Sequence, residues 1–322
     1  MPHGITVPEA LEAIETQGPE FFDLIGQADQ TRRIHRGDQV RLCGIVNAKS
    51  GNCPQDCAFC AQSAHNDAVI DRYPLISAED MTSKARELSR SKISRFGIVT
   101  SGRSIDRDEE IEEIAQAVAR ITDELPTAPC ASLGMLSKEH FQRLREAGLT
   151  RYHHNLETAA SFYPNICTTQ DYQDSVQTVE RAKEVGLQVC SGGLFGMGES
   201  PSQRVELLEA LRNLDVDSLP INFLNPIPGT KLEGMHQLTP QDCLKIVAVA
   251  RLMMPDKEIR VCGGRETNLR DMQSWIFPAG ADGMMVGGYL TTTGRRVEDD
   301  LQMLEDLGLT PVTAEGRAFP AD

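Results

Sequence analysis

The chain has 322 residues, of which 40% are apolar and 25% charged, so it is long enough to bury a large core. Its formal charge is −15 and it contains no long Lys/Arg run, which argues against nucleic acid as a partner. The first residues are acidic where a secretory signal needs basic and then apolar residues, and no apolar run approaches about 18 residues, so we expect a cytoplasmic protein without membrane contact.

Residues 1–39 are predicted to form a helical extension, because apolar residues recur with loosely helical spacing from 8 to 36, interrupted at Gly18-Pro19. Beyond it, short β-branched segments alternate with amphipathic stretches, a pattern typical of β-α units around a parallel sheet. The expected strands are 40–48, 94–101, 128–134, 151–157, 187–195, 218–224, 258–264 and 283–288. The expected helices between them are 78–92, 108–124, 137–147, 170–185, 201–214 and 240–253.

Eight strands without a Pro/Gly/Ser-rich linker favour one TIM-type (β/α)₈ barrel over residues 40–308. A doubly wound open sheet is the alternative. Residues 309–322 are expected to form a loose C-terminal tail. In a barrel of this type the chemistry lies at the carboxyl ends of the strands, so the site is expected there.

Three of the nine cysteines, Cys53, Cys57 and Cys60, lie in one loop after the first predicted strand. In a chain without an export signal, such crowding favours metal or redox chemistry over disulfides. Thiolates bind iron–sulfur clusters or zinc. Three ligands on a 4Fe-4S cluster leave one iron open to chelate a substrate, whereas structural zinc needs a fourth ligand, for which His65 is the nearby candidate. We favour the open cluster.

The Cys-x3-Cys-x2-Cys spacing, with Phe59 before the last Cys, resembles the signature of the radical S-adenosylmethionine superfamily. That resemblance implies that the amino acid end of S-adenosylmethionine binds the open iron, and that an electron cleaves the sulfonium to give a 5′-deoxyadenosyl radical. Over residues 40–310 the chain further resembles the biotin synthase family, in the segments NAKSGNCPQDCAFCAQS, CASLGML, RYHHNLET, NICTTQDY, VCSGGLFGMGES, LPINFLNPIPGT, IRVCGGRE and GGYLTTTG. The implied enzyme is a sulfurtransferase whose substrate is dethiobiotin.

The resemblance implies an auxiliary iron–sulfur cluster as the sulfur donor, which in the better-known form of the family is a 2Fe-2S cluster held by three Cys and one Arg. Cys130, Cys190 and Arg260 match three of those ligands, and Arg260 is counted with the cysteine triplet among the catalytic residues. The fourth position holds Gly97 instead of Cys.

A thiolate on the first strand, Cys43, is a candidate replacement for the missing ligand, because adjacent strands lie only about 4.8 Å apart. Cys262 is a further candidate, because residues i and i+2 of a strand share a face and Arg260 is its i−2 neighbour. We therefore expect an auxiliary cluster of more than two irons, with four as the expected number, on Cys43, Cys130 and Cys190 with Arg260 or Cys262. The alternative is that Cys43 is a packed small side chain and that Cys130 and Cys190 hold the cluster together with non-cysteine ligands. For Cys167 and Cys243 a packed small side chain is favoured.

The same resemblance suggests roles for the remaining polar positions. Asn155 and Asn222 are expected to read the ureido ring of dethiobiotin, since an amide offers both a donor and an acceptor. His153 is expected at another substrate-facing position, where the better-known form of the family has Asn, and Glu157 is expected to bind the ribose hydroxyls of S-adenosylmethionine. Further expected contacts are Phe59, Gly192, Gly193 and Gly196 for the cofactor, with a tight turn as the alternative for the glycines, and Thr292 and Thr293 for the substrate, with helix capping as theirs.

Two other functions are compatible with the triplet. A radical mutase or maturase would keep it without a sacrificial cluster, and an iron–sulfur sensor would need no open iron. The resemblance to biotin synthases also implies a small electron-transfer protein, flavodoxin or ferredoxin, as electron donor, and a homodimer.

Overall fold

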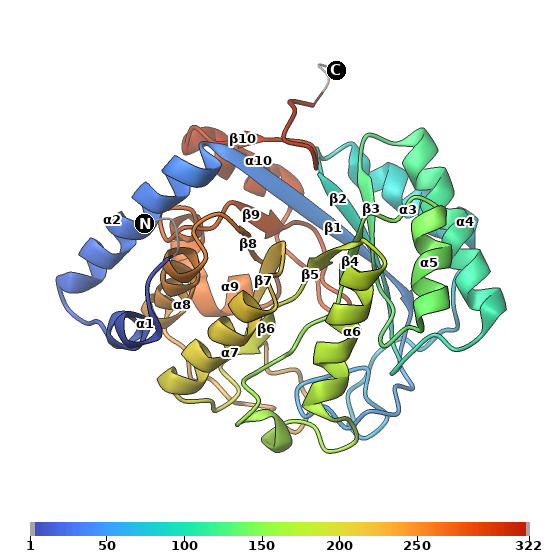
Figure 1. The fold of residues 1–322 in the computed structure, drawn as a ribbon, viewed down its shortest axis with the longest axis horizontal. Helices are drawn as coiled ribbons and strands as arrows, with labels where there is room; N and C mark the ends of the chain where they lie inside the picture. Colours follow the sequence, from blue (N-terminus) through green and yellow to red (C-terminus); the bar gives the residue numbers. More distant parts are fainter. Residues whose placement is uncertain (1–3, 320–322) are drawn as a thin grey trace.

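Eight parallel strands close into a barrel in the computed structural model, which describes residues 4–319 (Figure 1). Neighbouring strands pair in the order β1-β2-β3-β4-β5-β7-β8-β9, and β9 pairs back with β1. The short strand β6 follows β5 and pairs with β7. The strands are β1 Gln39–Lys49, β2 Arg95–Thr100, β3 Ala128–Ser132, β4 Arg151–His153, β5 Gln188–Cys190, β6 Gly193–Phe195, β7 Ser218–Phe223, β8 Glu258–Val261 and β9 Gly283–Met285. The predicted (β/α)₈ barrel is confirmed, and the alternative of an open sheet is wrong.

Helices surround the barrel, and most begin at a side-chain cap. Ser77 Oγ accepts from Asp80 N at 3.1 Å at the start of α3, and Ser200 and Thr239 form capping boxes before α7 and α8. The helices between strands are α3 Ala78–Ser89, α4 Asp108–Glu124, α5 Lys138–Glu146, α6 Tyr172–Glu184, α7 Pro201–Asn213, α8 Pro240–Met253, α9 Arg265–Leu269 and α10 Val297–Asp306. The two 3₁₀ segments are η1 Tyr163–Asn165 and η2 Arg270–Ile276.

Two helices precede the barrel, α1 Val7–Ile14 and α2 Glu20–Arg36, and both pack against α8 (Figure 1). At the other end of the chain, Thr310–Pro311 form strand β10, which pairs in parallel with the start of β1. Val312 N also donates to Val40 O at 3.0 Å. The expectation of a loose tail is therefore wrong for this part of the chain, because its backbone is bound to the sheet; residues 320–322 lie outside the described residues.

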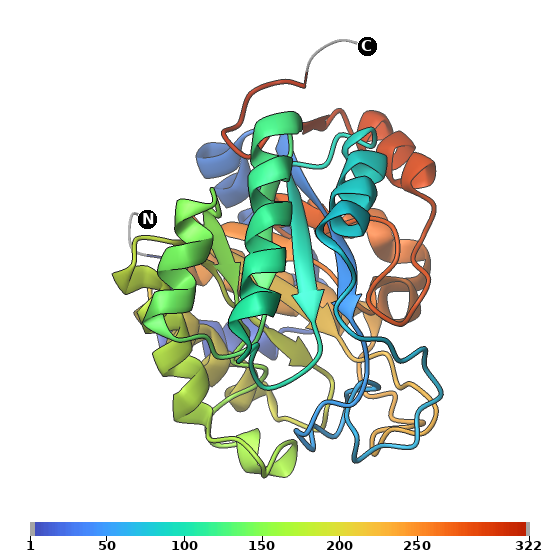
Figure 2. The same cartoon turned by 90° about the vertical axis from the view of Figure 1, so that its right-hand side faces the viewer.

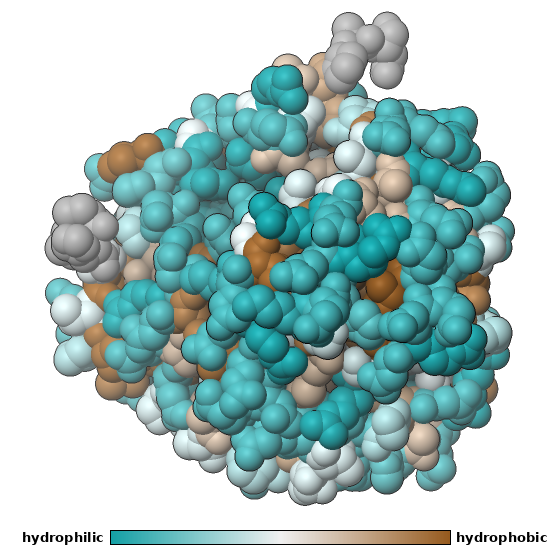
Figure 3. Space-filling view, turned by 45° about the vertical axis from the view of Figure 1, so that its right-hand side comes forward, coloured by the Kyte–Doolittle hydropathy of each residue, from teal (hydrophilic) through white to brown (hydrophobic). Residues whose placement is uncertain are grey.

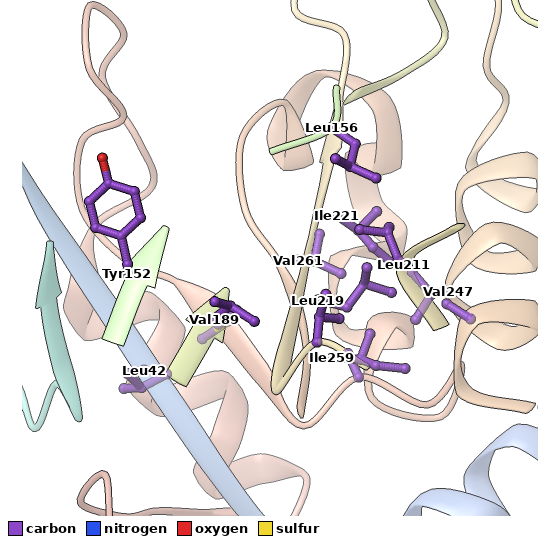
Figure 4. Close-up of a cluster of buried hydrophobic side chains, with 14 of the residues drawn as sticks. Leu42, Tyr152, Leu156, Val189, Leu211, Leu219, Ile221, Val247, Ile259 and Val261 are labelled. Atoms are coloured by element: carbon purple, nitrogen blue, oxygen red, sulfur yellow. The ribbon is translucent and has the colours of Figure 1, made fainter. Parts of the chain in front are cut away.

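The side chains of each strand alternate between the helix layer and the barrel lumen. Leu42, Val189, Leu219 and Ile259 point outward and join the apolar core between strands and helices (Figure 4). Cys43, next to Leu42, lines the lumen instead. The outer surface is mainly hydrophilic in the view of Figure 3, as the charge count predicts.

The carboxyl ends of the strands meet at one end of the molecule, where long loops gather (Figure 2). The loop after β1 touches the loop after β7 there, since Asp67 N donates to Gly229 O at 2.8 Å. Within residues 4–319, no helix has the length and apolar character to cross a membrane.

Candidate functional site

A cavity of about 340 Å³ occupies the lumen at the carboxyl ends of the strands. Its lining contains most of the residues that the sequence singled out: Cys43, Cys53, Cys57, Phe59, Cys60, Cys130, His153, Asn155, Glu157, Cys190, Asn222, Arg260, Cys262 and Thr292. Gly192, Gly193, Gly196 and Thr293 do not line it. The structure thus brings together residues from every part of the barrel sequence.

The cysteine triplet lies on a loop that is held by its own backbone and side chains. Cys53 N donates to Gln62 O at 3.0 Å, and Ala64 N donates to Cys53 O at 2.8 Å. The amide of Asn66 donates to the carbonyls of Cys57 and Cys60 at 3.1 and 2.9 Å. These bonds hold the loop in place, and all three of its cysteines line the cavity. Burial raises the pKa of Cys60 to about 11, so a bound cation is needed to keep it as a thiolate.

A second loop, which follows β4, packs against the triplet loop, where Ala58 N donates to Ile166 O at 2.8 Å. Cys167 lies there, 3% exposed, with its Sγ 3.7 Å from Cys57 Sγ. The hydrogen bond between the two sulfurs raises the pKa of Cys57 and lowers that of Cys167. No sequence pattern pairs these two residues, because 110 positions separate them.

Four more thiols line the lumen from different strands. Cys43, Cys130 and Cys190 lie on β1, β3 and β5, and Cys262 follows β8; all four are at most 6% exposed. Within residues 4–319, no three His, Cys, Asp or Glu side chains converge closely enough to hold a single metal ion. The thiols therefore share one buried space, spread wider than a mononuclear site.

Three buried guanidinium groups, those of Arg95, Arg151 and Arg260, lie beside these thiols. Glu258 pairs with two of them, with Arg151 at 3.0 Å and with Arg260. Arg95 donates instead to the neutral side chains of Thr150 and Gln188. Arg260 Nε and Arg95 Nε are buried without a hydrogen-bond partner. Excess positive charge and unpaired donors beside several thiols suit an anionic iron–sulfur cluster. The residues present therefore fit an auxiliary cluster.

The electrostatics single out one of the lumen thiols. Burial raises the pKa of Cys130 to about 12. Burial acts in the same direction on Cys190, but a hydrogen bond with His153 and the charges of His153, Arg260 and Arg151 outweigh it and lower its pKa to about 6. Cys190 is thus the lumen thiol best prepared to bind iron as a thiolate.

The strand register places Gly97 opposite Ile45 on β1 and opposite Cys130 on β3. Cys43 pairs with Arg95, two residues before Gly97, which is about 6.6 Å along a strand. Moving a ligand from position 97 to Cys43 therefore shifts it along the strand as well as across to the neighbouring one. The spacing between strands, used alone, underestimates this displacement.

The two expected substrate amides are already engaged with backbone. Asn155 Oδ1 accepts from Gly192 N at 3.2 Å, and Asn222 donates to Gly193 O at 3.2 Å and accepts from Gly263 N at 3.0 Å. Each amide keeps one hydrogen and one lone pair for a ligand. Gly192 and Gly193 therefore bind these amides through their backbone, and neither lines the cavity, where a contact with the cofactor was expected.

Gly192 and Gly193 allow backbone to approach backbone, since a Cβ at either residue would overlap a carbonyl, that of Pro220 or Glu157. Gly196 has φ +96° in a turn closed by Glu199, whose carboxylate accepts from its backbone N at 2.8 Å. Thr292 lines the cavity, but its hydroxyl donates to Tyr289 O at 3.0 Å.

Glu157 lies two residues after Asn155, with a backbone φ of +66°. Burial raises the pKa of its carboxyl to about 7, against the opposing effects of His153 and Asn155. His153 itself points to Cys190, with Nδ1 3.5 Å from its Sγ. Sequence reasoning missed Arg95, Arg151 and Glu258; the signal available was a charged residue within a short predicted strand, which is rarely buried without a partner.

A (β/α)₈ barrel with a Cys-x3-Cys-x2-Cys loop after its first strand defines a radical S-adenosylmethionine enzyme, and residues 48–211 match the Radical SAM superfamily. Residues 220–310 match the Biotin and Thiamin Synthesis associated domain. The chain is 54% identical to the biotin synthase of Geotalea daltonii over 306 residues, covering 95% of this chain and 93% of the relative, and 55% identical to that of Geobacter sulfurreducens over 302 residues, covering 94% and 92%. The chain belongs to the biotin synthase family.

Solved structures of lower sequence identity share the fold. Methylornithine synthase superposes with a TM-score of 0.84 at 22% identity, covering 96% of this chain and 94% of its own. The FeFe-hydrogenase maturase HydG from Carboxydothermus hydrogenoformans gives 0.83 at 18% identity, covering 97% and 77%. These likenesses extend over the barrel and the N-terminal helices, and they concern the fold.

Proposed function

We propose that this chain is a sulfurtransferase that inserts sulfur into dethiobiotin to form biotin. The main observation in support of this function is that one cavity is lined by two distinct groups of thiols. Three lie on the loop after β1, and four lie inside or just beyond the barrel strands. A mutase or maturase needs the first group only. A sensor needs neither an enclosed cavity nor amides facing it.

Cys53, Cys57 and Cys60 would hold the 4Fe-4S cluster, which supplies the electron that cleaves S-adenosylmethionine. Phe59 packs in the apolar group beneath this loop and helps fix it. The ionised carboxyl of Glu157 offers two acceptors for the ribose diol.

Dethiobiotin would occupy the part of the cavity between the two groups of thiols. Asn155 and Asn222 offer the remaining donor and acceptor of each amide to its ureido ring. Because each amide is already bonded, Asn222 to backbone and Asn155 to backbone and the Glu157 carboxylate, the amides are oriented before the substrate arrives, which lowers the entropy cost of binding. Thr292 at the cavity edge, with Thr293 beyond it, is the proposed contact of the substrate carboxylate.

The auxiliary cluster would be held by Cys43, Cys130 and Cys190 with Arg260 or Cys262, and it would contain more than two irons. Support comes from the shared lumen and the low pKa of Cys190. With glycine at position 97, the chain lacks one thiolate that a 2Fe-2S cluster uses. Cys43 is displaced from that position both along and across the strands, and a four-iron cluster spans such a distance more readily.

An electron donor and a partner subunit complete the proposal. A flavodoxin or ferredoxin would reduce the triplet cluster, since the reaction consumes electrons that no side chain of the described residues supplies. A homodimer, in which each barrel keeps its own site, stays a prediction that light scattering tests.

The decisive experiment compares Cys57→Ala with Cys243→Ala, a buried thiol on α8 outside the cavity. After anaerobic reconstitution, Cys57→Ala should form no 5′-deoxyadenosine and no biotin, while Cys243→Ala should form both. Normal cleavage of S-adenosylmethionine by Cys57→Ala would contradict the proposal. Cleavage without biotin by the unmodified chain would favour the mutase or maturase, and neither product would favour the sensor.

A further inference from the structure

Cys57, a proposed cluster ligand, lies close to Cys167, a thiol to which the proposed reaction assigns no role. Their sulfurs lie 3.7 Å apart, and no second hydrogen bond between two sulfurs occurs among the cysteines of the described chain. A disulfide bond is about 2.05 Å long, so the sulfurs need to approach by about 1.7 Å. Side-chain rotation at two cysteines covers a movement of that size.

The backbone on both sides of the pair holds the two loops together. Ala58 N donates to Ile166 O at 2.8 Å, directly beside the two cysteines. The Asp56 carboxylate accepts from the backbone N of Thr168 at 2.8 Å and of Thr169 at 3.2 Å. Asp56 N in turn donates to Thr169 Oγ1 at 3.0 Å. Since these bonds lie on each side of the sulfurs, the short distance is a property of the fold.

The surroundings of the two thiols differ in a way that suits sequential oxidation. Cys57 lines the cavity and is open to small solutes that enter it. Cys167 lies behind it in an apolar group formed with Tyr163, Ile166, Leu194, Met197 and Leu224. An oxidant in the cavity therefore meets Cys57 first, and Cys167 is the nearest thiol that can react next.

We propose that Cys57 and Cys167 form a reversible disulfide when the triplet loop carries no cluster and a hydroperoxide is present. The hydroperoxide oxidises the Cys57 sulfur to a sulfenic acid and is itself reduced to an alcohol, or to water if it is hydrogen peroxide. The Cys167 sulfur then attacks the Cys57 sulfur: the S–S bond forms, the S–O bond breaks, and water leaves with the Cys167 proton. Two thiols thus lose two electrons to one hydroperoxide, and a dithiol reductant returns them by exchange.

The disulfide would protect the triplet loop during cluster loss. Sulfenic acid that is not captured oxidises further to sulfinic acid, which thiols do not reduce. The disulfide with Cys167 prevents this further oxidation. It also keeps Cys57 from binding iron until a reductant restores the two thiols. The effect on cluster loading rests on the proposed function, in which Cys57 binds iron; formation of the disulfide does not.

The test uses the full chain freed of iron, treated with a small excess of hydrogen peroxide, alkylated and mapped by peptide mass spectrometry. The expected product joins Cys57 to Cys167 in most chains, and Cys243→Ala behaves in the same way. In Cys167→Ala, Cys57 is expected as sulfinic acid. Iron–sulfur reconstitution of the oxidised chain should fail at the triplet, recover fully with dithiothreitol in the unmodified chain, and stay lost in Cys167→Ala.

Two outcomes would overturn the proposal. One is that, after peroxide treatment, disulfides join cysteines within the triplet and Cys167 remains a free thiol. The other is equal recovery of triplet iron by the unmodified chain and Cys167→Ala. A linked Cys57–Cys167 peptide in a chain that never forms 5′-deoxyadenosine would instead support the thiol pair and contradict the proposed function, so the two failures are distinguishable.

Discussion

His153 Nδ1 lies 3.5 Å from Cys190 Sγ, and the two residues are register partners on β4 and β5. The imidazole therefore contacts a proposed ligand of the auxiliary cluster, in addition to facing the cavity. This contact contributes to the low pKa of Cys190. His153 is thus placed to favour the thiolate form of Cys190. From the sequence, His153 was predicted only as a substrate contact.

Replacing His153 should affect auxiliary iron before it affects substrate affinity. In His153→Ala we expect less auxiliary iron per chain with the triplet cluster retained, because Cys190 loses the group that favours its thiolate. His153→Asn, which keeps a donor, should retain more iron. Iron and sulfide counts with Mössbauer spectra measure this, and His236→Ala, at an exposed position outside the cavity, is the control. Unchanged iron with weakened dethiobiotin binding would return His153 to the substrate site.

The auxiliary ligand set is tested at Cys43. Cys43→Ser should lose auxiliary iron and biotin formation while it keeps the triplet cluster and cleavage of S-adenosylmethionine. Cys243→Ser is the matched control, since it removes a buried thiol outside the cavity. Full iron content and normal biotin formation in Cys43→Ser would mean that Cys43 is a packed small side chain.

Glu157 predicts a pH dependence of S-adenosylmethionine binding. Burial raises the pKa of this acid from its usual range to about 7, so the carboxyl is mainly neutral at pH 6 and mainly ionised at pH 8. Only the ionised form offers both oxygens as acceptors to the ribose diol. Affinity should therefore fall by about tenfold from pH 8 to pH 6, in proportion to the ionised fraction.

Equilibrium dialysis of S-adenosylmethionine against the reconstituted chain measures this dependence. Glu157→Gln, which does not titrate, should bind weakly at both pH values. The prediction fails if Glu157→Gln shows the same pH dependence as the unmodified chain, because another group would then be responsible.

The sequence predicted the barrel because the alternation of β-branched and amphipathic segments is strong, and the starts of most helices because Ser or Thr caps precede them. Helix α4 was predicted without such a cap, from an amphipathic stretch of 17 residues, whereas the uncapped helices α9 and α10, of 5 and 10 residues, were missed. The strand registers could not be predicted, because nothing in the local sequence indicates that Gly97 lies opposite Ile45. The Cγ2 of Ile45 would lie 3.0 Å from a Cβ at residue 97. Contacts between distant loops, such as Cys57 with Cys167, depend on the closed fold and leave no pattern in the chain.

Asn222 offers the sharpest separation of a binding role from a structural one. Its amide already bonds Gly193 O and Gly263 N, so Asn222→Ala should cost about 1–3 kcal/mol of stability for each unpaired buried group, in addition to any loss of binding. Asn268→Ala is the control, because that amide donates to Leu224 O and Gly264 O at 2.9 Å without lining the cavity. Both variants should unfold at lower temperature. Only Asn222→Ala should also weaken dethiobiotin binding, by about ten- to a hundredfold for the lost donor and acceptor, with S-adenosylmethionine binding unchanged. If calorimetry shows equal dethiobiotin affinity in the two variants, Asn222 holds strands β6 and β8 together and does not read the substrate.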